Sequence, residues 1–160
     1  MSLTQIEADQ LFELKKFQAD NIFVNFPIQG EEIEIELQNE TGRIRFIGDI
    51  NNANEIVRKA TLQLRCKKVI ILRRLDFNGN HRNPPDKAPD PIFEGYENYV
   101  FRREDHIHFY IEGYGERWAL PLSYFSNIDI TENDDLFEKM QKFFKYCNVE
   151  DLKVRKILEL

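Results

Sequence analysis

The sequence has few of the residues that cross-link small proteins or ligate metal ions, with two cysteines and three histidines in 160 residues. Cys66 and Cys147 lie far apart, and neither belongs to a CxxC motif or to a Cys/His cluster. We therefore expect two buried free thiols, as in a reducing cytosol, and no disulfide or redox role.

Long apolar runs are also missing. No window approaches the roughly 18 consecutive apolar residues that a membrane-spanning helix needs. The N-terminal ten residues lack the basic segment and apolar run of a secretory signal. These absences predict a cytoplasmic protein with no membrane contact.

Positive charge is the third scarce feature. The chain has 22 Lys and Arg against 28 Asp and Glu, which gives a formal net charge of −6. Proteins that bind nucleic acid nonspecifically usually carry a basic face. The balance disfavours a broad phosphate-binding surface and leaves room only for a local basic patch.

The residues that are abundant indicate one globular domain. Hydrophobic residues make up 42% of the chain and include 13 phenylalanines. A chain of this length buries roughly two-thirds of its unfolded surface without disulfides or metal. We expect residues 1–160 to form a single domain.

Two helices are predicted, one near each end of the chain. Thr4-Gln5-Ile6-Glu7 matches a capping box, and the apolar stripe behind it has helical spacing, so the first helix should begin here and end near Asp20. A second capping signature begins at Thr131, and the apolar positions of residues 136–147 predict a helix that ends near Asn148.

Between the helices, a period of two indicates β-strands. Apolar and polar residues alternate at 22–26, 33–37, 44–46 and 61–66. The continuous apolar run at 69–72 is typical of a central strand. Residues 49–54 are rich in asparagine and predict a loop, and the Pro-rich stretch at about 78–99 predicts a long one. The expected fold is α+β, a mostly antiparallel sheet flanked by the two helices, with residues 150–160 as a short helix or a partner-binding segment.

The segment from Glu104 to Leu122, EDHIHFYIEGYGERWALPL, contains two of the three histidines and the only tryptophan. Successive side chains of a strand point to opposite faces, so this segment predicts one apolar and one polar face. A turn at Gly113-Tyr114-Gly115, where glycine can adopt a positive φ, would return the chain as a second strand. The apolar face is Ile107, Phe109 and Ile111, expected to be buried, and the polar face is His106, His108, Tyr110 and Glu112, expected to be accessible to solvent.

His106 and His108 are close enough on this face to act on a single bound group. Imidazoles near their ordinary pKa of about 6.5 can act as acid and base on a phosphodiester, hold a phosphate as cations, or ligate a metal. A metal site would need a third ligand from His81, Asp105 or Glu112, and the sequence has no HExxH or CxxC motif to complete it.

We therefore favour acid–base chemistry without a metal or other cofactor. Arginines would stabilise the charge of a pentacovalent phosphate, and tyrosines would orient a phosphate oxygen. The alternative is that the two histidines only form hydrogen bonds with neighbouring side chains and water on an exposed sheet. The candidate catalytic residues are His81, Arg82, His106 and His108, and the candidate substrate-binding residues are Tyr110, Glu112, Tyr114 and Arg117.

Four segments carry a resemblance to a known family: LTQIEAD, HRNP, HIHFYIEGYGERWALPL and FFKYCNV. In this order they are similar to a family of short bacterial and prophage-encoded proteins, a domain of unknown function, over nearly the whole chain. The family's hairpin motif, His-x-His followed by Tyr, Glu-Gly-Tyr-Gly and Lys/Arg-Trp-Ala, corresponds to residues 106–119. One departure is Arg103-Glu104-Asp105, which stands where the family has Cys-Pro or a similar pair and weakens any ligand role for this segment. The resemblance implies the position of the site and a mobile-element context, and implies nothing about the chemistry.

Two functional hypotheses follow. The first is a small RNA-acting protein, a toxin-like, metal-independent endoribonuclease of a mobile element. The acidic net charge counts against it unless arginines gather around the hairpin; these are Arg73, Arg74, Arg82, Arg102, Arg103 and Arg117. The second is a non-enzymatic interaction module, an antitoxin or a phage anti-defence protein, which binds a host or cognate protein through the hairpin and the Pro-rich loop.

Overall fold

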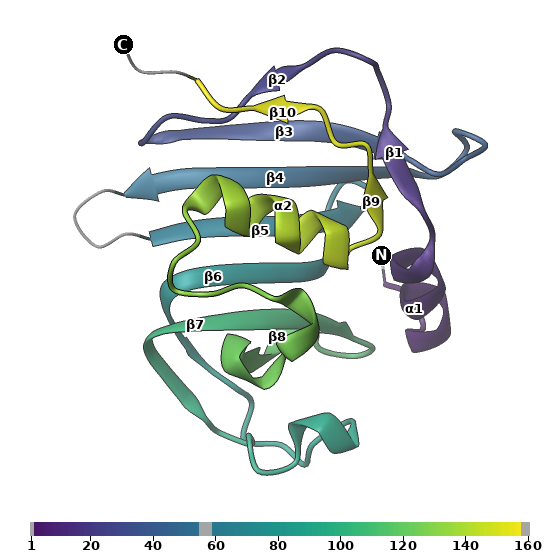
Figure 1. Cartoon of the computed structure of the whole chain (residues 1–160). Helices are drawn as coiled ribbons and strands as arrows, with labels where there is room; N and C mark the ends of the chain where they lie inside the picture. Colours follow the sequence, from purple (N-terminus) through teal and green to yellow (C-terminus); the bar gives the residue numbers. More distant parts are fainter. Residues whose placement is uncertain (1, 55–58, 158–160) are drawn as a thin grey trace.

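The computed structural model describes residues 2–54 and 59–157, and the side chain of residue 54 is not described. It contains a large curled sheet with one helix lying across it (Figure 1). The strands of this sheet lie in the order β8-β7-β6-β5-β4-β3-β1-β9. Their bounds are β1 Lys16–Gln18, β3 Glu31–Gln38, β4 Arg45–Asn54, β5 Lys59–Cys66, β6 Ile70–Arg82, β7 Val100–Ile111, β8 Gly115–Pro121 and β9 Val149–Glu150.

The sheet is mixed rather than purely antiparallel. Neighbouring strands from β8 to β1 are antiparallel, whereas β1 and β9 run parallel. Two short strands, β2 (Val24–Asn25) and β10 (Val154–Arg155), form a separate parallel pair. The predicted α+β class is confirmed, and β6 is an interior strand as its apolar run indicated. No helix in the described part of the chain is long and apolar enough to cross a membrane.

The first helix, α1 (Gln5–Glu13), begins at the predicted capping box, in which Thr4 and Glu7 satisfy each other's amides. Its predicted end near Asp20 is wrong. The chain leaves the helix after Glu13 and pairs as β1 with β3 and β9. The buried Lys16 ammonium donates hydrogen bonds to the carbonyls of Phe12 and Leu14 at the end of α1 and of Cys147 at the end of α2.

The second helix, α2 (Leu136–Tyr146), begins after Asp135 rather than Thr131. Asp135 and Glu138 form its capping box, while the Asp134 carboxylate accepts the Thr131 amide in the turn before it. Met140, Phe143 and Phe144 face the sheet and are fully buried. A Cβ on Gly48 of β4 would lie 2.9 Å from the Phe144 ring, so strand and helix are in direct contact there.

We call the sheet face that packs against α2 the inner face and the opposite one the outer face. Leu62, Leu75 and Ile107 are paired across β5, β6 and β7 on the inner face and are fully buried. Phe109 is 5% exposed on the same face, whereas Ile111 is only half-buried. The expected burial of the apolar side of the hairpin is therefore confirmed for Ile107 and Phe109. Both cysteines are free and buried, as predicted.

Strands extend into three segments for which the sequence predicted a loop, a loop, and a helix or binding segment. Residues 49–54 form part of β4, because β3 and β5 pair with that stretch from both sides. The expected long loop begins only after Arg82, because β6 continues to that residue and pairs with β7. In the tail predicted as a helix or binding segment, the short strands β9 and β10 end at Glu150 and Arg155, and residues 158–160 lie outside the described part.

Candidate functional site: a buried histidine cluster

The outer face carries the polar residues of β6 and β7. Asp76 is paired with His106, and Arg74 is paired with His108, so all four side chains share this face. Thr61 of β5 lies opposite Asp76 in the next ladder. The predicted separation of the hairpin into an apolar and a polar face is confirmed.

The polar face is nevertheless covered by the C-terminal part of β6 and the N-terminal part of β7. The β6–β7 register shifts between Asp76 and Gly79 and again between Gly79 and His81, and beyond these shifts both strands fold back over the outer face. The Phe101 ring stacks on the His106 ring with centroids 4.7 Å apart, and the His81 ring lies 6.0 Å from the Phe101 ring. Irregular register of this kind bends a hairpin sharply.

The fold-back brings the three histidines together. Ring centroids are 4.5 Å apart for His81 and His108, 5.8 Å for His81 and His106, and 4.8 Å for His106 and His108. His106 is 0% exposed, His108 is 4% exposed, and His81 is partly exposed. The prediction that His106 and His108 are accessible to solvent is wrong, because the C-terminal part of β6 and the N-terminal part of β7 cover them.

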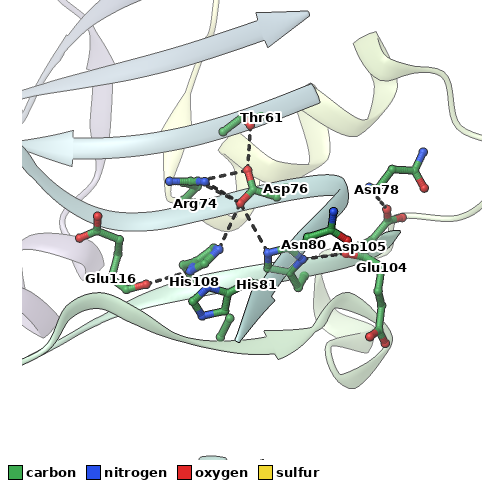
Figure 2. Close-up of polar contacts among 12 residues, drawn as sticks. Thr61, Arg74, Asp76, Asn78, Asn80, His81, Glu104, Asp105, His108 and Glu116 are labelled. Atoms are coloured by element: carbon green, nitrogen blue, oxygen red, sulfur yellow. Dashed lines mark hydrogen bonds and ion pairs between the residues drawn. The ribbon is translucent and has the colours of Figure 1, made fainter. Parts of the chain in front are cut away.

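Asp76 is the anion at the centre of this cluster (Figure 2). Its carboxylate accepts hydrogen bonds from Thr61 Oγ1 at 2.7 Å and from Arg74 Nε at 3.0 and 3.1 Å. The Nε2 atoms of His108 and His106 lie 3.1 and 3.5 Å from Asp76 Oδ2. Burial alone would raise the pKa of Asp76, but the bonds from His108, Arg74 and Thr61 outweigh it and the pKa lies well below the ordinary value.

Each histidine is oriented by one backbone carbonyl. His106 Nδ1 lies 2.7 Å from the Glu104 oxygen, His108 Nδ1 2.8 Å from the Glu116 oxygen, and His81 Nε2 2.8 Å from the Arg117 oxygen. A carbonyl oxygen can only accept, so each of these nitrogens must carry a proton. The Nε2 atoms of both rings point at Asp76. His108 Nε2 is hydrogen-bonded to Asp76 Oδ2 at 3.1 Å, whereas His106 Nε2 has no hydrogen-bond partner and carries the lone pair of the neutral ring.

Burial lowers the pKa values of two of the rings. The pKa of His81 is lowered to about 4 by desolvation and by the nearby His108, and the pKa of His106 is lowered by desolvation. Both rings are therefore neutral at pH 7. The expectation of histidines near their ordinary pKa is wrong for these two, and neither can supply a proton as an imidazolium acid.

Gly79 lies against the cluster at the first register shift. A Cβ at this position would lie 2.8 Å from His106 Cε1 and 3.1 Å from Asp76 Cβ. Carbon atoms in contact normally stay about 3.5 to 4.0 Å apart. A glycine is thus required for the strand to approach the His106 ring this closely.

The other predicted site residues divide into two groups. Arg82 and Arg117 are exposed beside His81, and Arg117 packs over the Tyr114 ring at 5.0 Å. Tyr110 is buried, and its hydroxyl bonds to the Leu3 amide and carbonyl. The Glu112 carboxylate accepts the Gln5 amide at the start of α1. Tyr110 and Glu112 thus fasten the N-terminal segment to the hairpin rather than facing a ligand with the histidines.

Asp76 was not among the predicted site residues. The sequence did offer a signal for it: Asp76 is a single acid in the alternating stretch Arg73-Arg74-Leu75-Asp76 of a central strand. Burial of a carboxylate without partners is energetically unfavourable, so an acid at such a position indicates a paired or ligating group. The acids that were considered as third ligands have other contacts: Asp105 accepts the Asn78 amide, and Glu112 is at the start of α1. Among the described residues, Asp76, His106 and His108 form a group whose potential ligand atoms lie within 4.8 Å of one another.

A family model for a family of unknown function, DUF6978, matches residues 3–149. The chain belongs to this family. The part of the chain that matches DUF6978 contains α1, α2 and the whole histidine cluster, and the predicted resemblance to a domain of unknown function is confirmed. Comparison with curated proteins and with solved structures returned no match.

Proposed function

We propose that the protein is a small intracellular enzyme that cleaves RNA phosphodiesters at the histidine cluster. The observation that carries the proposal is a cluster of three histidines at one buried carboxylate: His106 and His108 lie against Asp76, and the His81 ring lies 4.5 Å from the His108 ring. Clusters of titratable groups with perturbed pKa values are characteristic of reactive sites.

His81 is the histidine that reaches a substrate. It is partly exposed, whereas His106 and His108 lie behind it. Because its ring is neutral at pH 7, one nitrogen lone pair can accept the proton of an attacking hydroxyl, either water or a ribose 2′-hydroxyl. The buried rings and Asp76 hold the cluster in place and set its electrostatics.

Exposed arginines on the three strands that carry or adjoin the histidine cluster support RNA as the substrate. Arg82 of β6, Arg102 and Arg103 of β7 and Arg117 of β8 are all exposed. In a protein with a net charge of −6, these arginines are the available partners for a phosphate group. The remaining two arginines of the expected patch are used elsewhere. Arg73 packs on the Phe12 and Phe109 rings, and Arg74 pairs with Asp76.

The test uses the protein as isolated, without added or removed metal. It is incubated with cellular RNA, and cleavage is followed on gels with analysis of the new ends. His81→Ala should lower the cleavage rate at least about 100-fold, as expected for loss of a proton-transfer group. Arg43→Ala, an exposed arginine in the turn between β3 and β4, is the matched control and should cleave like the parent.

A toxin-like role predicts a second readout in cells. Expression of the parent should arrest growth and deplete RNA, and His81→Ala should do neither while accumulating to the same level. Absence of cleavage by the parent protein with every RNA tested would contradict the enzymatic proposal.

The second candidate is the non-enzymatic interaction module, and a different observation favours it. Ile22, Phe23, Ile28 and Ile157, which flank the small β2–β10 pair, are 47 to 68% exposed. Exposed apolar side chains of this size are typical of protein interaction surfaces when they form a patch. Ile22→Asp with Phe23→Asp should then abolish partner binding while leaving RNA cleavage unaffected.

A further inference from the structure

We infer that Asp76, His106 and His108 bind one divalent first-row transition-metal ion, with zinc as the best fit. The ligand atoms are Asp76 Oδ2 and the Nε2 atoms of the two histidines. The sequence did not favour a metal site, because it has no HExxH or CxxC motif, and Asp76 of β6 was not among the third ligands considered.

The distances agree with a metal site. Ligands about 2.0 to 2.1 Å from a tetrahedral ion lie about 3.3 Å from one another. The two carboxylate–imidazole separations are 3.1 and 3.5 Å. All three potential ligand atoms lie within 4.8 Å, so the remaining separation has to close by at most about 1.5 Å when the ion binds.

The unsatisfied nitrogen of His106 is the second observation. His106 Nε2 is fully buried and has no hydrogen-bond partner. Its proton is on Nδ1, which donates to the Glu104 carbonyl, so a bare lone pair faces the Asp76 carboxylate at 3.5 Å. Two acceptors that face each other in a buried site repel one another. A cation between them converts this repulsion into two bonds.

The surroundings of the three ligands have the form that metal sites require. Histidine ligands normally donate their second ring nitrogen to a carbonyl or carboxylate, and both rings do so here. Ligating carboxylates are themselves hydrogen-bonded, and Asp76 is held by Thr61 and Arg74. A carboxylate has roughly four acceptor sites, so these bonds leave Oδ2 able to bind an ion.

The donor set selects the kind of ion. Two imidazoles and one carboxylate suit zinc and its first-row neighbours, whereas magnesium and calcium prefer oxygen ligands alone. Three protein ligands leave a coordination position for water or substrate, and an ion bound there acts as a Lewis acid. The partly exposed His81 ring lies 4.5 Å from His108 on the solvent side of the group.

Metal binding is tested without reference to catalysis. The protein is stripped with a chelator and titrated by calorimetry with zinc chloride, and with magnesium chloride for comparison. We expect one zinc ion per chain, a higher Tm with zinc, and no response to magnesium. Cobalt in place of zinc should give the visible absorption of a low-coordinate site.

Asp76→Asn removes the charge with almost no change of shape, and it should weaken zinc binding at least about 100-fold, since loss of even an outer partner costs about 10- to 100-fold. Asp49→Asn is the matched control. Asp49 lies on the same outer face and pairs with Arg65 at 2.8 Å, so its loss removes a comparable ion pair without touching the ligands. Asp49→Asn should bind zinc like the parent.

The metal site can be tested separately from the proposed function. Only a role of the ion in RNA cleavage rests on the proposed function. Absence of zinc binding by a folded parent protein, or equal binding by Asp76→Asn and the parent, would overturn the metal site, and the cluster would then be a hydrogen-bonded structural network. Zinc binding by a protein that cleaves no RNA supports the site and overturns the proposed function. RNA cleavage by a parent protein that cannot bind zinc supports the proposed function and overturns the metal site.

Discussion

Replacement of Gly79 by alanine tests the close approach between β6 and His106. The new Cβ would lie 2.8 Å from His106 Cε1, so strand and ring must separate by about 0.7 Å or more to reach normal contact. The ring cannot move freely, because Phe101 stacks on it at 4.7 Å and Glu104 holds its Nδ1. Overpacking of this kind costs about 1 to 3 kcal/mol.

Part of that cost is offset in the unfolded state. Gly79 does not have a positive φ, so alanine fits the backbone and gains about 0.4 to 1 kcal/mol from reduced unfolded-chain entropy. At the middle of the two ranges the net loss is about 1.3 kcal/mol. At about 2 to 4 °C per kcal/mol for a domain of this size, Tm should fall by about 3 to 5 °C.

Thermal unfolding by circular dichroism measures this loss, and proton–carbon NMR spectra of the histidine rings show whether His106 has moved. Gly48→Ala is the control, because its Cβ would meet the Phe144 ring on the inner face at 2.9 Å. It should also lower Tm but leave the three histidine signals in place. A Gly79→Ala protein with parental Tm and parental His106 signals would show that β6 does not approach the His106 ring as closely as the structure indicates.

Three further predictions concern stability. Phe109→Ala should cost about 3 to 5 kcal/mol in urea unfolding, since Phe109 is 5% exposed; an unchanged midpoint would mean that the two hairpin faces are inverted. Lys16→Met leaves three carbonyls without their donor and should cost at least about 3 kcal/mol. Burial lowers the pKa of Lys16 from 10.5 to about 8, so between these pH values the unfolded state binds more protons than the folded state. The free energy of unfolding of the parent should therefore increase as the pH rises from about 8 to 10.5, and Lys16→Met should lack this increase. Gly113→Val places a β-branched residue at a φ of +84° and should lower Tm by an amount that corresponds to about 1 to 3 kcal/mol, whereas equal melting would show that the turn tolerates side chains.

Local patterns in the sequence were sufficient to predict several features of the fold. The capping box at Thr4, the alternation that separates Ile107 and Phe109 from the histidines, and the positive φ of Gly113 and Gly115 are all confirmed. Each depends on residues within a few positions of one another, where helix and strand geometry alone decide the outcome. Element ends were predicted less well, because pairing with distant strands decided them. Residues 49–54 are an example.

The composition of the candidate site depended on both levels. That His106 and His108 share a face of one strand follows from the sequence alone, because the period of a strand is two. That Asp76 joins them depends on the β6–β7 register, in which Asp76 and His106 are partners. Likewise, the burial of both histidines follows from the way β6 and β7 bend over them beyond Gly79. Register and fold-back arise from contacts between residues about 30 positions apart, and no local pattern specifies them.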